Sequence, residues 1–105
     1  MASEFKSEIL VKNDEKIITK KINKEFIPIL SIFEITTLIS VRTTQIENEA
    51  VPCVEYSVND TPKNIAIREL EQKKIPFLIK RKLGQYVEIW TIDELELNTD
   101  LIPYD

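Results

Sequence analysis

Residues 31–48, which read SIFEITTLISVRTTQIEN, predict the first helix of the protein. Ser31 and Glu34 form a capping-box pattern, in which each side chain can accept a hydrogen bond from the free backbone amide of the other residue. At 100° per residue, the aliphatic side chains fall in a band about a third of a turn wide and show no two-residue alternation. They are Ile32, Ile35, Leu38, Ile39 and Ile46. Because β-branched residues are poor helix formers, packing must supply most of the stability of this helix.

Arg42 lies in the middle of this apolar band. Burying its charge without a partner would cost several kcal/mol. Either its aliphatic stem lies along the core while the guanidinium reaches water, or the guanidinium meets an acceptor. The acceptor could be a carboxylate of this chain, such as Glu69, or a group on a partner.

A second helix is predicted over residues 62–74. Asp60-Thr61-Pro62 is a typical helix start, with a capping side chain followed by proline at the first helical position. Small Ala66 on its apolar side allows another helix to approach closely. Pro76 is expected to end the helix, since the residue before proline avoids helical backbone angles.

A β-hairpin is predicted over residues 77–91, with its turn at Gly84 and Gln85. Alternation places Tyr86, Glu88 and Trp90 on one face of the returning strand. Thr91 and Glu94 repeat the capping-box pattern and predict a short helical turn. The fold class is therefore α+β, a small single domain with a two-helix core followed by a hairpin and a short C-terminal turn.

The remaining segments give weaker signals. Residues 1–28 form an N-terminal arm, either a hairpin around Asn13-Asp14 or a segment ordered only on a partner, and residues 29–105 form the domain. Residues 49–60 read as an irregular loop with a possible short strand, Val54–Val58. The last eight residues are expected to be extended.

Composition excludes most familiar enzyme designs. The 105 residues include no His, one Cys and one Gly, so that His-dependent nucleophile pairs, Cys-rich zinc sites and glycine-rich phosphate loops are ruled out. We expect no cofactor and no metal. Without about 18 consecutive apolar residues, no membrane span is predicted. We expect an intracellular protein in which Cys53 is a reduced thiol that acts as a small apolar filler.

Charge is unevenly distributed along the chain. The net charge is −4, yet residues 73–82 form a basic segment between acidic regions. This segment either faces phosphate groups or is a solvated strand pair whose lysines discourage edge pairing. We favour the second interpretation, because duplex-binding domains are normally basic overall.

Several motifs, taken in order, resemble those of a known family: the small subunit of multisubunit DNA-dependent RNA polymerases, called omega in bacteria, subunit K in archaea and the common sixth subunit in eukaryotes. The similar motifs are Leu30-Ser31-x-Phe33-Glu34, Arg42-Thr43-x-Gln45-Ile46, Pro62-x-x-Ile65-Ala66-x-x-Glu69-Leu70, Lys74-Ile75-Pro76 followed by Leu78-Ile79-Lys80-Arg81, and Trp90 with Asp93-Glu94-Leu95. The resemblance covers about residues 29–97 and favours the archaeal and eukaryotic branch. The chain departs from the family at residues 24–27, where an arginine-isoleucine-threonine-threonine stretch is usual.

This resemblance implies an omega-like fold and a non-catalytic subunit. Such a subunit clamps the largest polymerase subunit and promotes assembly of the enzyme, with nucleic acid only an indirect partner. We expect no homo-oligomer and no membrane partner. A large DNA virus with its own polymerase is our hypothesis for the source, and a cellular parasite with an AT-rich genome is the alternative. The compartment would be the host cytoplasm or virion in the first case and the nucleus in a eukaryotic cell.

The partner interface is expected on the two helices. The candidate residues are Glu34, Arg42, Thr43, Gln45, Ala66, Glu69 and Leu70. Arg42 and Glu69 would fix helix orientation, within the chain or across the interface, and Ala66 and Leu70 would pack closely. The same residues could instead build the core of this domain.

Two other function classes remain open. The chain could be a free-standing nucleic-acid module, with the basic segment (Lys73, Lys74, Lys80, Arg81 and Lys82) surrounding exposed Tyr86 and Trp90. An enzyme that uses Glu34 and Glu69 as a carboxylate pair is a residual possibility.

Overall fold

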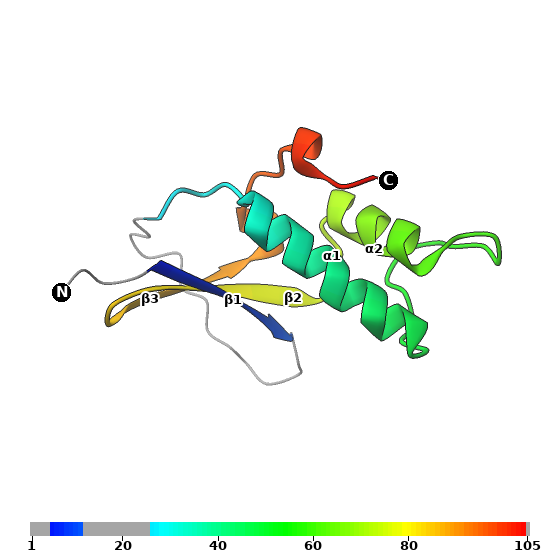
Figure 1. The fold of residues 1–105 in the computed structure, drawn as a ribbon, viewed down its shortest axis with the longest axis horizontal. Helices are drawn as coiled ribbons and strands as arrows, with labels where there is room; N and C mark the ends of the chain where they lie inside the picture. The colour runs from blue at the N-terminus through cyan, green and yellow to red at the C-terminus, as the bar shows by residue number, and fades with distance from the viewer. Residues whose placement is uncertain (1–4, 12–25, 105) are drawn as a thin grey trace.

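The structure, a computed structural model, describes residues 5–11 and 26–104. The elements follow in the order β1 (Phe5–Val11), α1 (Ile32–Glu47), α2 (Pro62–Glu71), β2 (Phe77–Leu83) and β3 (Tyr86–Thr91). Single turns of 3-10 helix follow at Ile92–Glu94 and Thr99–Leu101. Figure 1 shows the two helices beside the sheet. The α+β class, the two-helix core, the hairpin and the short turn after it are thus confirmed.

The sheet is antiparallel, with β2 between β1 and β3. In its register, Ile9 lies opposite Ile79, which lies opposite Trp90. β1 belongs to the segment assigned to the N-terminal arm, and its partner is β2 of the same chain. The rest of the hairpin predicted around Asn13-Asp14 lies outside the described residues. A domain boundary at residue 28 therefore stays a prediction.

α1 begins as the sequence predicts. The Glu34 amide donates to Ser31 Oγ at 3.1 Å, and the Ser31 amide donates to Glu34 Oε1 at 2.9 Å. The helix ends in a Schellman motif: the Ala50 amide donates to the Gln45 carbonyl at 2.9 Å, with Glu49 between them at φ 72°. A glutamate thus occupies a left-handed position where glycine is preferred.

α2 ends at Glu71, earlier than the predicted residue 74. The Lys74 amide donates to the Glu69 carbonyl at 2.8 Å, and Lys73 has φ 57°. A second Schellman motif therefore ends the helix before Pro76 can act. At its start, Thr61 Oγ1 accepts from the Asn64 amide at 3.2 Å, as a capping residue should.

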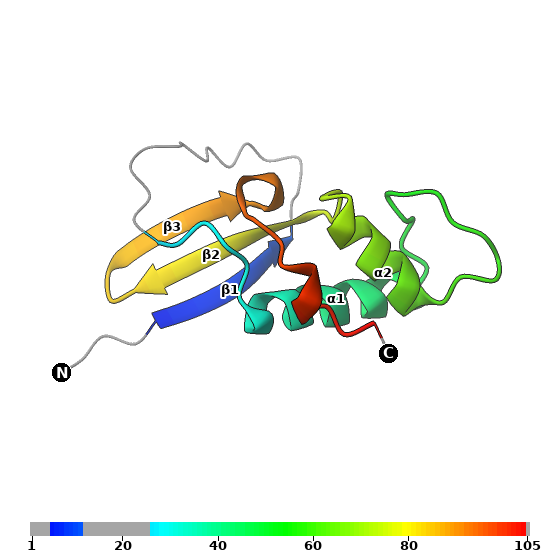
Figure 2. The same ribbon diagram turned by 90° about the horizontal axis from the view of Figure 1, so that it is seen from above.

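One hydrophobic core joins the helices, the sheet and the C-terminal segment. Its buried members are Leu30, Ile35, Leu38, Ile39, Ala66, Ile67, Leu70, Ile75, Phe77, Ile79, Trp90, Ile92, Leu95 and Ile102. Figures 1 and 2 together show the C-terminal segment lying over the helices. The expected extended tail is wrong, because Ile102 is buried in this core and a 3-10 turn precedes it.

Three further sequence expectations differ from the structure. Ile32 is exposed, although it falls in the apolar band of α1. Residues 54–58 form no strand, since none of the described strands pairs with them, and only Val54 of this run is buried. Cys53 is exposed and so is not a buried filler.

The two left-handed helix ends yield a stability prediction. We expect Glu49→Gly to raise the free energy of unfolding by about 0.5–1 kcal/mol. Glycine removes the strain of a side chain at positive φ from the folded state, and this gain exceeds the cost of the greater backbone freedom of glycine in the unfolded state. Glu47→Gly, at the last residue of α1, is the matched control and should lower it, because glycine disfavours the helical backbone. Urea unfolding followed by Trp90 fluorescence measures both. A loss of stability in both variants would contradict the strain argument.

Candidate protein–protein interface

A buried ion pair joins the two helices. Arg42 Nε donates to Glu69 Oε1 at 2.6 Å, and Arg42 Nη2 donates to Glu69 Oε2 at 2.9 Å. Both side chains are almost fully inaccessible to solvent. The hydrogen bond to Glu69 raises the pKa of Arg42 more than burial lowers it, so the guanidinium stays charged. Of the environments considered for Arg42 from the sequence, the structure shows the one in which its guanidinium binds a carboxylate of the same chain.

The same pair anchors the loop that follows α1. Arg42 Nη2 also donates to the Val51 carbonyl at 3.0 Å, and the Cys53 amide donates to Glu69 Oε2 at 2.7 Å. Arg42 Nη1 donates to Gln45 Oε1 at 3.0 Å. One arginine therefore fixes α1, α2 and the start of the loop relative to one another.

A second buried ion pair joins α1 to β2. Arg81 donates to Glu34 twice, from Nη2 to Oε1 at 2.8 Å and from Nε to Oε2 at 2.9 Å. Ser7 Oγ of β1 donates to the same carboxylate at 2.6 Å. Burial alone would raise the pKa of Glu34, but the hydrogen bonds from Arg81, Ser31 and Ser7 outweigh it and hold the pKa below its ordinary value.

Arg81 also holds the segment before α1. Its Nη1 donates to the Ile27 carbonyl at 2.6 Å, and its Nη2 donates to the Ile29 carbonyl at 2.8 Å. The guanidinium carbon lies 5.3 Å from the centre of the Trp90 ring, within cation–π range. Sequence reasoning missed this pair. The available signal was alternation along β2, which puts Arg81 on the same face as Phe77 and Ile79.

A third buried carboxylate, Glu88, organises the end of the sheet. It accepts from Trp90 Nε1 at 2.9 Å and from the Tyr86 hydroxyl at 2.5 Å. The Phe26 amide approaches the same carboxylate at 3.4 Å. The three β3 side chains lie on one face, as the sequence predicts. Trp90 is only 5% exposed, however, so its expected role as an exposed aromatic is wrong.

The structure brings the predicted interface residues together mainly inside the domain. Glu34, Arg42, Ala66, Glu69 and Leu70 are buried among the chain's own side chains. Thr43 and Gln45 are half-buried at the edge of α1. A role of these seven residues in partner binding stays a prediction, since any direct contact by the buried five would require them to become accessible.

In the two alternative sites, the basic segment and the Glu34/Glu69 pair, key side chains are bonded within the chain itself. Arg81 of the basic segment is buried against Glu34, and Lys73 Nζ donates to the Leu95 carbonyl at 2.7 Å. Glu34 and Glu69 each bind a different arginine, so neither is a free acid or base. The described residues contain no cluster of acidic or cysteine side chains able to hold a metal ion. None of the described helices has the length and hydrophobicity to span a bilayer.

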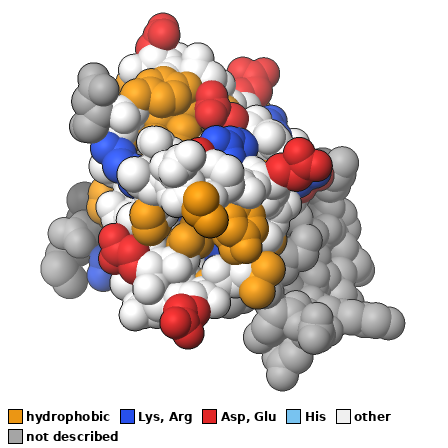
Figure 3. All heavy atoms as spheres, turned by 90° about the vertical axis from the view of Figure 1, so that its right-hand side faces the viewer, with side chains coloured by type: hydrophobic (Ala, Val, Ile, Leu, Met, Phe, Trp, Pro, Cys, Tyr) orange, Lys and Arg blue, Asp and Glu red, His pale blue; other side chains and the backbone are white. Residues whose placement is uncertain are grey.

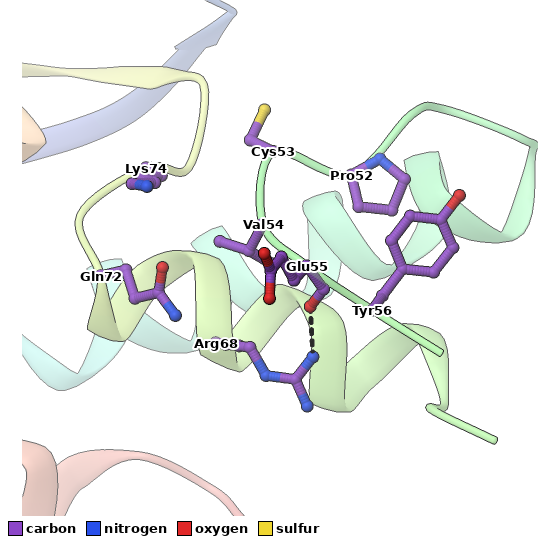
Figure 4. A pocket seen from close by; sticks show the side chains of 8 residues that line it. All are labelled: Pro52, Cys53, Val54, Glu55, Tyr56, Arg68, Gln72 and Lys74. Atoms are coloured by element: carbon purple, nitrogen blue, oxygen red, sulfur yellow. Dashed lines mark hydrogen bonds between the residues drawn. The ribbon is translucent and has the colours of Figure 1, made fainter. Parts of the chain in front are cut away.

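A hollow of about 980 Å³ lies between the 52–56 loop and α2 (Figure 4). Its lining includes Cys53, Glu55, Arg68 and Lys74. Arg68 Nη1 donates to the Glu55 carbonyl at 2.7 Å and also binds Asp60. Burial and the nearby Glu69 carboxylate raise the pKa of the Cys53 thiol, which disfavours the reactive thiolate. This arrangement suits a structural loop better than a reaction site.

The exposed face of α1 carries no charge over three turns. Among residues 35–46, Arg42 is the sole charged side chain, and it points inward to Glu69. Thr36 Oγ1 donates to the Ile32 carbonyl, and Thr44 Oγ1 donates to the Ser40 carbonyl at 3.1 Å. These hydroxyls are satisfied within the helix. The face carries no charged side chain and comprises Ile32, Phe33, Thr36, Thr37, Ser40, Val41 and Thr44.

A second exposed apolar group lies on the loop after α1. Figure 3 shows hydrophobic side chains gathered at the end of the molecule where this loop lies. The loop contributes Val51, Tyr56 and Val58, which are 80%, 58% and 99% exposed. In a protein with 30% charged residues, such exposed apolar groups are typical of binding surfaces.

Comparison with known proteins identifies related chains. Residues 27–77 match the family described as RNA polymerase Rpb6. The chain is 37% identical over 70 residues to the RPABC2 subunit of DNA-directed RNA polymerases I, II and III of Schizosaccharomyces pombe, covering 65% of this chain and 49% of the relative. It is 39% identical over 64 residues to subunit 6B of RNA polymerases II and V of Arabidopsis thaliana, covering 60% and 44%.

A viral relative is also similar. DNA-directed RNA polymerase subunit 6 of Acanthamoeba polyphaga mimivirus is 36% identical over 84 residues, covering 76% of this chain and 21% of the relative. This chain thus spans about half the length of the cellular relatives it matches and less of the viral one. The resemblance predicted from the sequence motifs is confirmed.

The Arg42–Glu69 pair gives a mutational prediction. Arg42→Ala should lower the free energy of unfolding by about 3–5 kcal/mol, because it leaves the Glu69 carboxylate buried and unpaired. The double variant Arg42→Met, Glu69→Leu should recover most of this loss, since it removes both charges. Arg68→Ala, which breaks a half-buried pair with Asp60, is the control and should lose much less. Urea unfolding of the four proteins measures these differences, and equal losses for both single variants would contradict the assignment.

The lowered pKa of Glu34 predicts acid sensitivity. A carboxyl whose folded pKa is depressed adds stability above its unfolded pKa, near 4.5, and loses it as the pH falls through the folded value. The free energy of unfolding should therefore fall with pH below about 4.5. Glu34→Gln should flatten this fall while lowering stability at pH 7. Asp60→Asn gives the comparison, because the Asp60 pKa is also lowered, by its hydrogen bond to Arg68. An unchanged slope in Glu34→Gln would exclude Glu34 as a source.

Proposed function

We propose that this chain, which is similar to the RNA polymerase Rpb6 family over residues 27–77, is a non-catalytic subunit of a multisubunit DNA-dependent RNA polymerase. It binds the largest subunit of that enzyme, clamps its carboxy-terminal part and promotes assembly. The relatives are themselves described as polymerase subunits. The chemistry of transcription belongs to the large subunits, and this chain contributes binding free energy alone.

The observation that carries the proposal is the uncharged outer face of α1. The Thr36 and Thr44 hydroxyls on it bond to helix carbonyls, so a partner can cover these two donors without leaving them unsatisfied. Short threonine and serine side chains also let a partner approach the helix closely. A surface of this kind favours extensive contact with another protein over capture of a small molecule or phosphate backbone.

The buried residues of the predicted interface act indirectly in this proposal. Arg42 and Glu69 fix the angle between α1 and α2, and Ala66 and Leu70 fill the space between the helices. Thr43 and Gln45 lie at the border of the uncharged face and are the members of the set able to touch a partner directly.

Binding of the folded partner explains how a small subunit promotes assembly. A protein that binds only the native state of another stabilises it by mass action, by about 2.7 kcal/mol at a hundredfold excess over the Kd. The compartment follows the enzyme, which is the nucleus for a cellular eukaryotic polymerase and the host cytoplasm or virion for a viral one.

The experiment is affinity capture of the full chain from its native source, followed by mass spectrometry and direct binding to the recovered largest subunit. Ser40→Glu places a charge in the middle of the α1 face and should weaken this binding at least about tenfold, equal to about 1.4 kcal/mol. Asn64→Glu adds the same charge on an exposed position of α2 and should bind normally. Failure of the unsubstituted chain to recover a polymerase would overturn the function, and normal binding by Ser40→Glu would overturn the assigned face.

A further inference from the structure

β1 lies at the edge of the sheet. It pairs with β2 along one side over all seven residues, and no strand within residues 5–11 and 26–104 pairs with its other side. An unpaired strand edge presents backbone N–H and C=O groups at the spacing that a further paired strand would need. β1 therefore has the geometry needed to accept one more strand.

A groove runs along this edge. A hollow of about 550 Å³ is lined by Phe5, Lys6, Ser7 and Glu8 together with Ser31 and Phe33. Successive side chains of a strand point to opposite faces of the sheet. The hollow touches four consecutive residues of β1 and the start of α1, so it follows the strand where the strand faces the helix, and β2 pairs with only one edge of β1.

The walls of the groove are apolar. Phe5 is 51% exposed and Phe33 is 60% exposed. Phe33 also belongs to the uncharged face of α1, so the groove opens directly onto that face. A chain lying in it would pair with β1 on one side and place aliphatic side chains against the two aromatic rings.

Charges on the opposite sheet face specify the partner further. Ser7 and Arg81 point toward Glu34, so alternation puts Lys6 and Lys82 on the other face. These two lysines lie directly opposite each other in the register. Like charges at opposed positions are destabilising. An acidic side chain placed beside Lys6 by an added strand would relieve this repulsion.

We propose that the free edge of β1 binds an extended segment of the largest polymerase subunit by strand addition. Inward side chains of that segment are aliphatic and fill the groove between Phe5 and Phe33, and an outward acidic side chain lies beside Lys6. Main-chain hydrogen bonds supply the affinity, and the alternate side chains supply the specificity. This inference rests on the proposed function, because it names the surface and the kind of segment by which the same partner is held.

Hydrogen–deuterium exchange of the full chain, alone and bound to the purified largest subunit, tests the strand addition. In the free chain, alternate amides of residues 5–11 should exchange quickly, since only one side of β1 is paired. Binding should slow the exchange of these amides. The supporting result is slowing confined to β1 amides and to the neighbouring start of α1.

Charge reversal tests the acidic contact. Lys6→Glu should weaken binding about fivefold, since an opposed charge pair becomes a repulsive one. Lys74→Glu makes the same change at an exposed position just after α2 and should change the affinity less than twofold. Equal effects of the two variants would overturn the assignment of an acidic residue beside Lys6.

The outcomes separate this inference from the function on which it rests. Binding without slowed exchange in β1 overturns the strand addition and leaves the polymerase function standing. Amides of β1 that are all protected in the free chain, or a dimer of the free chain in light scattering, show that another segment or a second copy occupies the edge and overturn it as well. Absence of any binding overturns both.

Discussion

Helix α1 is held by two buried charges of opposite sign, and the rest of the fold is arranged around them. Glu34 in its first turn forms a salt bridge with Arg81 of β2, and Arg42 two turns later forms one with Glu69 of α2. Each pair is bidentate, so it fixes direction as well as distance. Apolar contacts alone would let α1 rotate or slide against its neighbours. We regard the ion pairs as the features that select one packing, while the aliphatic core provides most of the stability.

This internal use of charge determines what the surface can do. Within the described residues, the two buried arginines bind the carboxylates of Glu34 and Glu69, and the buried Glu88 accepts hydrogen bonds from Trp90 and Tyr86. The outer face of α1 then carries neither charge nor free threonine hydroxyls at Thr36 and Thr44. This surface fits the binding role proposed above. For the partner proposed above, the matching surface would be equally poor in charge where it meets α1.

Local sequence patterns predicted the elements because their determinants lie within a few residues of one another. The capping box at Ser31 and Glu34 and the hairpin around Gly84 are of this kind. The Arg42–Glu69 pair could be proposed from the sequence as one of several alternatives, because an arginine in an apolar band needs a hydrogen-bond acceptor if it is buried. The Arg81–Glu34 pair could not, because 47 residues separate them and Arg81 stands among lysines that suggest a solvated strand. The same limit applies to β1, whose partner strand lies more than 60 residues away in the chain.

The segment that matches the family does not contain all the side chains that pack around it. Residues 27–77 contain Glu34 but end before Arg81, and they exclude β1, which supplies the Ser7 hydroxyl. A buried carboxylate without these donors would bear most of its desolvation cost uncompensated. Trp90, which packs on Arg81, also lies beyond the match. The α1–α2 unit therefore depends on the sheet at one end and on the 51–53 loop at the other. The sheet therefore supports the uncharged face of α1, although β1, β3 and nearly all of β2 lie outside residues 27–77, which match the family.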